Sequence, residues 1–190
     1  RFDGKDLEQK ETFADMGTGS IIGLLLIYFI LAWVFKSWSR PFSIMIMIPF
    51  AFIGAVLGHY LLGLTMSILS MFALLALAGI VVNNSIILVS TIERRLDDLR
   101  NQESREPNDN EIINEAIING VLDRLRPVLL TSLTTIGGLS ALMFETSLQA
   151  QFLIPMAATI VFGLGVTAFL VLVIVPSMMG ISNDFSNFVI

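Results

Sequence analysis

The sequence predicts an all-α integral membrane protein with five transmembrane helices and one cytoplasmic amphipathic helix. Of its 190 residues, 55% are hydrophobic and only 14% are charged, whereas soluble domains carry about 25% charged residues. The charges are also segregated, because five runs contain no Lys, Arg, Asp or Glu: 21–35, 42–62, 64–92, 127–144 and 152–180. A helix needs roughly 20 mainly apolar residues to cross a bilayer. Since backbone groups find no water there, each run is expected to be a helix.

The order of polar and apolar segments predicts the organisation of the chain. Residues 1–19 are polar and are expected to be the end of an external domain or a connector, cut from a longer protein. The five transmembrane helices are expected at 20–38, 41–62, 66–92, 125–144 and 152–176. Residues 93–124 are expected to form a cytoplasmic loop, with the amphipathic helix at about 109–123. Residues 177–190 are expected to be a cytoplasmic tail.

Prolines and glycines predict where the second span begins, bends and packs against another helix. Pro41 suits the first turn of a helix, and Pro49 is expected to kink the span further on. Gly54 and Gly58 form a GxxxG pattern, which allows another helix to approach closely. We expect this pattern to serve packing within the chain rather than dimerisation.

The distribution of basic residues predicts the orientation. Eight of the eleven Lys and Arg residues follow the first span or lie between the third and fourth: Lys36, Arg40, Arg94, Arg95, Arg100, Arg105, Arg124 and Arg126. The opposite turns, around 63–65 and 145–151, contain none. Basic loops remain in the cytoplasm. The N-terminus is therefore expected outside the cell membrane and the C-terminus in the cytoplasm.

Several classes of function are disfavoured by what the sequence lacks. Without cysteine there is no disulfide or thiolate metal site, and no metal or cofactor is predicted. A net charge of −5 does not indicate nucleic-acid binding. No HExxH, GxSxG or P-loop pattern occurs, so an enzyme is not expected. The single histidine, His59, is expected to be an interfacial residue at the outer end of the second span, and Glu145 to be solvated.

Polar residues inside the predicted spans are the candidates for function, because polar groups are costly in hydrocarbon. Span three contains Asn83, Asn84 and Ser85 in succession. Since helical residues are spaced by about 100°, they cannot share one face, and at least one Asn should point into the bundle. Span four contains Thr131, Ser132, Thr134 and Thr135, beyond Arg124 and Arg126. These residues either join helices, at about 1 kcal/mol per hydrogen bond, or line a path for protons or ions.

Three segments resemble a known transporter family. They are FKSWSRPFS at 35–43, GIVVNNSIILV at 79–89 and RLRPVLLTSLTT at 124–135, with Pro49 and Gly54 between the first two. In order and spacing they resemble the resistance-nodulation-division (RND) efflux transporters, in the acriflavine-resistance, hydrophobe/amphiphile branch. The chain is similar to the last five of the family's twelve membrane helices, eight to twelve. Residues 1–19 resemble the exit from its second periplasmic domain.

The resemblance implies proton-driven multidrug export by an antiporter of the bacterial inner membrane. It implies as partners the N-terminal half of the same pump, two further protomers of a homotrimer, a periplasmic adaptor and an outer-membrane channel, within the lipid bilayer. Such pumps pair two carboxylates on helix four with a lysine on helix ten and a threonine on helix eleven. Thr131 matches that threonine and Arg124 a family arginine, but Asn83 stands in place of the lysine. This departure implies a variant relay, another coupling ion, or a subfamily that works without the lysine.

The resulting hypotheses name specific residues. Candidates for proton relay or coupling are Asn83, Asn84, Thr131 and Arg124, with Ser85, Ser132 and Thr135 as secondary candidates. The alternative is a membrane scaffold or translocation-related component of the same superfamily, in which these polar residues are structural. A preceding half with two adjacent Asp in its fourth helix would favour the exporter.

Overall fold

The computed structural model describes residues 3–102 and 109–188, and these residues form seven helices and no strand. Five helical segments are long and apolar enough to cross a membrane: Lys10–Phe35, Ser39–Leu62, Ile68–Asn101, Glu111–Met143 and Ile154–Ile181. The predicted all-α class with five spans is therefore confirmed. The chain divides into two units, residues 1–42 and residues 43–190, and each is described by itself.

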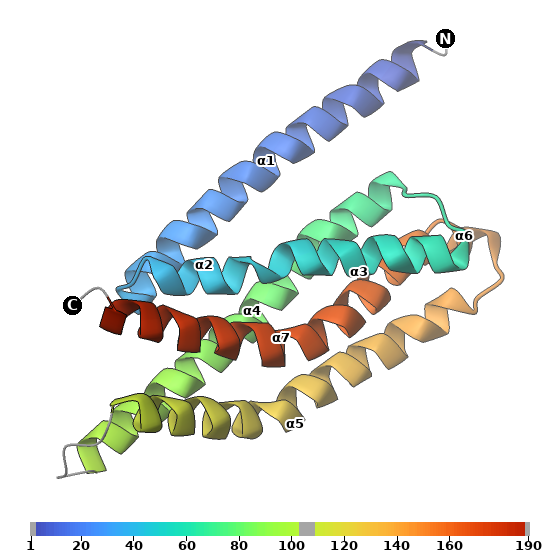
Figure 1. Ribbon diagram of the computed structural model, residues 1–190. Helices are drawn as coiled ribbons and strands as arrows, with labels where there is room; N and C mark the ends of the chain where they lie inside the picture. The colour runs from blue at the N-terminus through green and yellow to red at the C-terminus, as the bar shows by residue number, and fades with distance from the viewer. Residues whose placement is uncertain (1–2, 103–108, 189–190) are drawn as a thin grey trace. The chain divides into compact units, whose positions relative to one another are not determined.

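The first unit consists mainly of α1 (Asp3–Phe35), labelled in Figure 1. The helix begins at Asp3, so the polar segment expected as a connector at 1–19 is continuous with the first span over the described residues. After α1, Lys36 adopts a left-handed φ of 47°. The Tyr28 hydroxyl donates to the Trp38 carbonyl at 3.2 Å. A tight turn therefore connects α1 to α2 (Ser39–Met45).

The second predicted span is two helices, α2 and α3 (Met47–Leu62), interrupted at Ile46. Pro49 explains the interruption, because proline has no N–H and its ring clashes with the carbonyl four residues earlier, that of Met45. The kink expected at Pro49 therefore takes the form of a break on its N-terminal side. At its other end α3 stops at Gly63, whose φ of 64° is left-handed. Leu64 N–H donates to the His59 carbonyl at 2.9 Å, which completes a Schellman motif.

Close packing of α3 against α7 (Ile154–Phe188) forms part of the core of the second unit. An added Cβ at Gly54 would lie 3.0 Å from the Phe162 carbonyl oxygen, and one at Gly58 would overlap the Phe162 ring. On α7, an added Cβ at Gly163 would overlap the side chain of Leu77 from α4 and lie 3.1 Å from the Ala51 carbonyl oxygen of α3. The GxxxG pattern therefore serves packing within the chain, as predicted.

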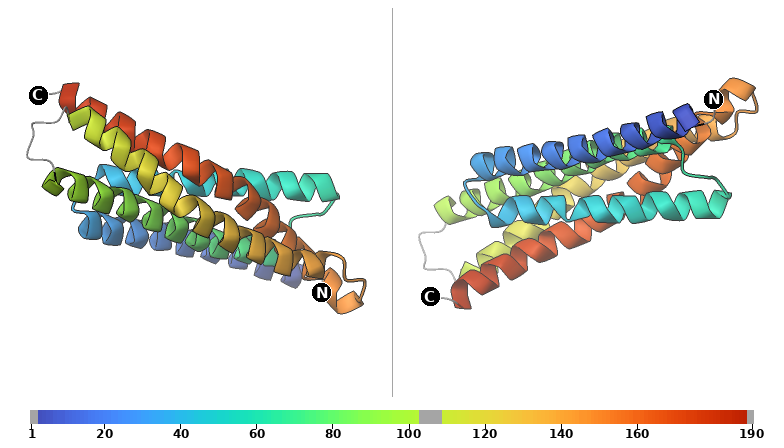
Figure 2. Two further views of the ribbon diagram at one scale, coloured as in Figure 1. Left: turned by 90° about the horizontal axis from the view of Figure 1, so that it is seen from below. Right: turned by 90° about the horizontal axis from the view of Figure 1, so that it is seen from above.

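The two long helices α4 (Ile68–Gln102) and α5 (Asp109–Met143) both pack on α7 and on each other (Figure 2). An added Cβ at Gly120 would lie 2.7 Å from Ile92 Cγ1, so the two backbones come close at this level. The amphipathic helix expected at about 109–123 is not separate from the fourth span. It is the first part of α5, which continues through Pro127.

The connection between α5 and α7 contains the short helix α6 (Leu148–Gln151). Ser147 caps it by accepting the Ala150 N–H. Glu145 is exposed, and its Oε1 accepts the N–H groups of Thr146 and Ser147 at 3.2 Å each. The tail expected at 177–190 is helical as far as Phe188, since α7 extends to that residue.

Candidate functional site

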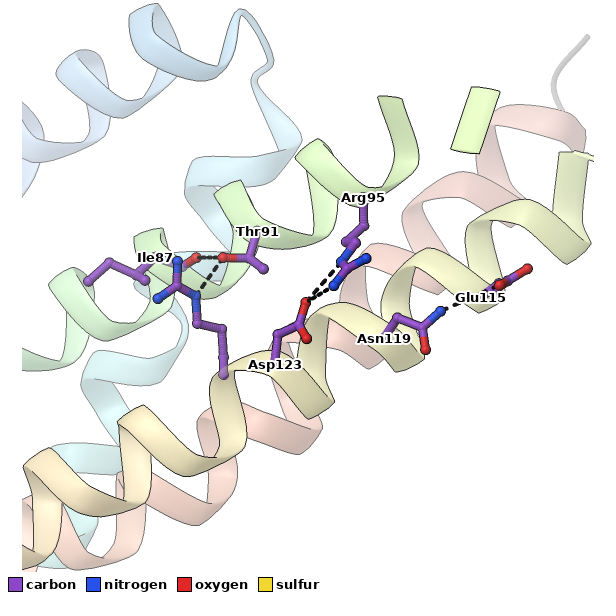
Figure 3. A network of polar contacts seen from close by, with 7 residues as sticks. Ile87, Thr91, Arg95, Glu115, Asn119 and Asp123 are labelled. Atoms are coloured by element: carbon purple, nitrogen blue, oxygen red, sulfur yellow. Dashed lines mark hydrogen bonds and ion pairs between the residues drawn. The ribbon is translucent and has the colours of Figure 1, made fainter. Parts of the chain in front are cut away.

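Arg124 on α5 is bound to α4 by one short hydrogen bond. Its Nε donates to Thr91 Oγ1 at 2.6 Å. Thr91 Oγ1 in turn donates to the Ile87 carbonyl at 2.8 Å (Figure 3). Arg124 and Thr91 are both half-buried. Because Thr91 accepts from Nε alone, the two terminal guanidinium nitrogens have no part in this bond. Arg124 therefore combines a fixed position with donors that can serve another group.

A second polar link lies beside the first. Arg95 donates from Nε and Nη2 to Asp123 Oδ2 at 2.9 and 2.6 Å, joining α4 to α5 (Figure 3). The side chains are 47% and 42% exposed. A pair this exposed contributes about 0–1 kcal/mol, since water and salt screen it. Together with the Arg124–Thr91 bond, the Arg95–Asp123 pair fixes the alignment of α4 and α5 at the end of the two helices that carries these arginines.

Asn84 and Thr131 lie deeper on the helix faces that hold Thr91 and Arg124. Asn84 precedes Thr91 by seven residues, and Thr131 follows Arg124 by seven, which is almost two helical turns in each helix. Asn84 is half-buried, whereas Asn83 and Thr131 are exposed. Within the part of the chain that the structure describes, neither asparagine amide has a hydrogen-bond partner. The second unit therefore presents polar side chains within two helical segments that are long and apolar enough to cross a membrane.

The hydroxyls of α5, which is the fourth predicted span, fall into two groups. Thr131, Thr134 and Thr135 donate to the carbonyls of Pro127, Leu130 and Thr131, at 3.0, 2.6 and 2.9 Å. Ser85 on α4 likewise donates to Val81 at 2.9 Å and is buried. Such bonds to the preceding turn satisfy a hydroxyl without a neighbouring helix. Ser132 differs, because it is 3% exposed and its Oγ has no partner among the described residues.

One polar cluster was missed by the sequence analysis. His59, expected at the interface, is instead 3% exposed, and its Nε2 lies 3.1 Å from Ser70 Oγ. Ser67 and Ser70 hydrogen-bond to each other across the start of α4. The spacing Ser67-x-x-Ser70 resembles a capping box, and this sequence feature could have indicated the cluster. Over the described ranges, no group of three or more His, Asp or Glu is arranged to hold a metal.

Comparison with known proteins gives a consistent set of relatives. A family model described as the AcrB/AcrD/AcrF family matches residues 1–181. The swarming motility protein SwrC of Bacillus subtilis is 32% identical over 175 residues, covering 91% of this chain and 16% of the relative. The cobalt-zinc-cadmium resistance protein CzcA of Cupriavidus metallidurans is 28% identical over 82% of this chain and 14% of its own length.

A solved structure supports the same relationship. The crystal structure of a heavy metal efflux pump, in its crystal form II, matches with a TM-score of 0.78 and 25% identity, over 93% of this chain and 16% of that protein. The chain thus spans less than a fifth of the length of these relatives. Because the family model matches nearly the whole sequence, the chain belongs to the AcrB/AcrD/AcrF family of RND transporters.

Proposed function

We propose that this chain is the C-terminal membrane portion, helices eight to twelve, of a proton-driven RND efflux pump. The observation that carries the proposal is the exposure of Asn83 and Thr131 within two segments long enough to span a membrane. Polar groups facing lipid are costly, so in a complete pump this face should be covered or line water. The N-terminal half of the same pump is the proposed cover.

Arg124 and Thr131 have complementary roles in this proposal. Arg124, fixed by Thr91, holds a positive charge two helical turns from Thr131. Asn83 and Asn84 cannot ionise, so they orient water or a carboxylate supplied by the other half. Proton uptake then takes place on that carboxylate, and the residues of this chain position it. Ser85, Ser132 and Thr135 remain secondary candidates for the same path.

The exported compounds are proposed from the relatives. Multidrug resistance protein MdtF of Escherichia coli is 33% identical over 65% of this chain and 11% of the relative. The multidrug branch that the sequence resembles favours hydrophobic and amphiphilic compounds. Heavy-metal ions are the second candidate, favoured by the crystal structures of a heavy metal efflux pump. An assay with both classes of compound decides between them.

The proposed setting is the bacterial inner membrane, with the N-terminus periplasmic and the C-terminus cytoplasmic. The positive-inside rule supports this orientation, because Arg95 and Arg124 lie where α4 and α5 are joined by the Arg95–Asp123 and Arg124–Thr91 contacts, and Arg94 and Arg126 are close to them in sequence. The proposed partners are two further protomers, a periplasmic adaptor and an outer-membrane channel. The lipid bilayer surrounds the remaining apolar faces.

The test uses the full-length protein that contains this segment, expressed in cells lacking their own efflux pumps. Asn83→Leu and Thr131→Ala are compared with wild type for dye and metal-ion efflux driven by an imposed proton gradient. Loss of gradient-driven efflux at normal membrane levels supports the proposal. Leu133→Ala, which alters an exposed apolar residue of α5, is the matched control and should leave efflux intact.

The scaffold interpretation is the alternative, in which the polar residues are structural. It is favoured by the observation that Thr131, Thr134 and Thr135 each satisfy their hydroxyl on the preceding turn. Normal efflux in both Asn83→Leu and Thr131→Ala would establish this alternative and exclude these residues from coupling.

A further inference from the structure

His59 and two serines form a hydrogen-bonded cluster where α3 meets α4, apart from the coupling residues proposed above. Ser67 N–H donates to Ser70 Oγ at 3.3 Å, and Ser70 N–H donates to Ser67 Oγ at 3.1 Å. This is the reciprocal arrangement of a capping box, with Ser70 in place of the usual Glu or Gln. His59, in the last turn of α3, places Nε2 3.1 Å from Ser70 Oγ. The end of α3 is thereby bonded to the cap of α4.

The contacts of the imidazole identify its neutral tautomer. His59 Nδ1 lies 2.9 Å from the Ala55 carbonyl oxygen. A carbonyl only accepts hydrogen bonds, so Nδ1 carries the proton and Nε2 accepts from the Ser70 hydroxyl. Ser70 Oγ in turn accepts from Ser67 N–H and from the Ser67 hydroxyl, 3.2 Å away. With a neutral ring, every donor of the cluster is paired.

We propose that His59 is a proton-binding site and that Ser70 and Ser67 carry the proton to it. Hydronium gives a proton to Ser67 Oγ, the original Ser67 hydroxyl proton passes to Ser70 Oγ, and the original Ser70 proton passes to His59 Nε2. Three bonds to hydrogen form and three break. Both serines end neutral, water is released, and the positive charge rests on the imidazolium.

The protonated cluster is as well paired as the neutral one. Nε2–H then donates to Ser70 Oγ, and the Ser70 hydroxyl turns to donate to Ser67 Oγ. A hydroxyl has one donor and two acceptor sites, so both oxygens stay within their capacity. The Ser67 hydroxyl is left to point outward, which its half-buried position and the exposed neighbour Thr65 permit. Reversing two hydroxyls therefore accommodates the proton without moving a helix.

The electrostatic surroundings of His59 are simple. The helices that pack most extensively against α3 are α7 and α4. Over the described residues, α4 has no charged side chain before Glu93, and α7 has none up to Ile181. Tyr60 is exposed, and Glu145 binds the N–H groups of its own loop. An imidazolium at His59 thus has the Ala55 carbonyl, Ser70 and the negative end of the α3 dipole as its stabilising partners.

The proposal is tested by following the His59 ring directly. The full-length protein is labelled with ¹⁵N-histidine and placed in lipid nanodiscs, and the His59 signals are assigned by their loss in His59→Gln. Ring nitrogen shifts are recorded while the buffer is made progressively more acidic. We expect a neutral Nδ1–H tautomer that converts to imidazolium. A ring that keeps one protonation state throughout, or an Nε2–H neutral tautomer, overturns the site.

The hydroxyl path has its own variants. Ser67→Ala and Ser70→Ala are expected to slow proton exchange at Nε2, while Thr65→Ala, whose hydroxyl is outside the cluster, leaves the exchange rate at the wild-type value. Equal exchange rates in all three variants overturn the path. Ser67 is only half-buried, so its variant should fold even if the Ser70 variant does not. Since the measurement does not use transport, its result is independent of the proposed efflux function.

Discussion

Arg124 Nε lies 2.6 Å from Thr91 Oγ1, although the two residues are 33 positions apart in the sequence. The bond joins a charged donor to a neutral acceptor in a half-buried position, where such bonds contribute more than neutral ones. It links α4 and α5 at the end where their arginines gather. The proposed role of Arg124 therefore depends on a residue that no motif identifies.

Thr91→Val is expected to destabilise the protein by about 1–2 kcal/mol, because a hydrogen bond to a charged group is lost. Thr91→Ser keeps the hydroxyl and should retain most of the stability. Ser90→Ala is the control, since Ser90 bonds only to the Ile87 carbonyl. Thermal unfolding in detergent measures all three. Equal loss in the Val and Ser variants would show that packing, and not the bond to Arg124, matters at position 91.

The Arg95–Asp123 pair is expected to contribute little despite its short distances. Because both side chains are close to half exposed, a double-mutant cycle with Arg95→Gln and Asp123→Asn should give a coupling energy below about 1 kcal/mol. Salt should reduce that coupling further. A coupling energy that is well above this value and insensitive to salt would contradict the exposed geometry.

Gly58→Ala is expected to destabilise the second unit by about 1–3 kcal/mol, because the added methyl overlaps the Phe162 ring. Gly79→Ala is the matched control. Gly79 is also in a helix but has nothing within 4 Å of its added Cβ, so the better helix propensity of alanine should leave stability equal or higher. The unfolding midpoints of the two variants are compared with that of the wild type. Similar losses of stability in Gly58→Ala and Gly79→Ala would contradict the close α3–α7 packing.

Ser132→Ala and Ser85→Ala should have opposite effects on stability. Ser132 Oγ is buried without a partner, so its removal takes away a desolvation cost and should be neutral or stabilising by up to about 1 kcal/mol. Ser85 is buried and its hydroxyl donates to the Val81 carbonyl at 2.9 Å, so Ser85→Ala removes a made hydrogen bond and should cost about 0.5–1.5 kcal/mol of stability. Destabilisation by Ser132→Ala would indicate that its hydroxyl binds a group such as water or the other half of the pump.

Sequence reasoning identified the spans and the family because both depend on local features. Charge-free runs set the five helices, and the segment beginning at Arg124 carries the family resemblance. The use of Gly54 and Gly58 for close packing was also correct, since only small residues let two helix backbones approach this closely.

The long-range pairs were beyond the same reasoning. Whether Thr91 meets Arg124, or His59 meets Ser70, depends on how two helices cross, and helical periodicity says nothing about that crossing. The continuity of α5 was missed for a related reason. Pro127 and the change from polar to apolar residues both indicate a boundary, but packing against α4 and α7 keeps the helix whole.

Pro127 has one further consequence, because it lies between Arg124 and Thr131 in a single rod. Its missing N–H leaves the Asp123 carbonyl without its usual helical donor, which makes this a point where α5 can bend. A tilt on one side of this pivot need not be copied on the other. The part of α5 that carries Thr131 could therefore tilt while the part that carries Arg124, held by Thr91, stays in place.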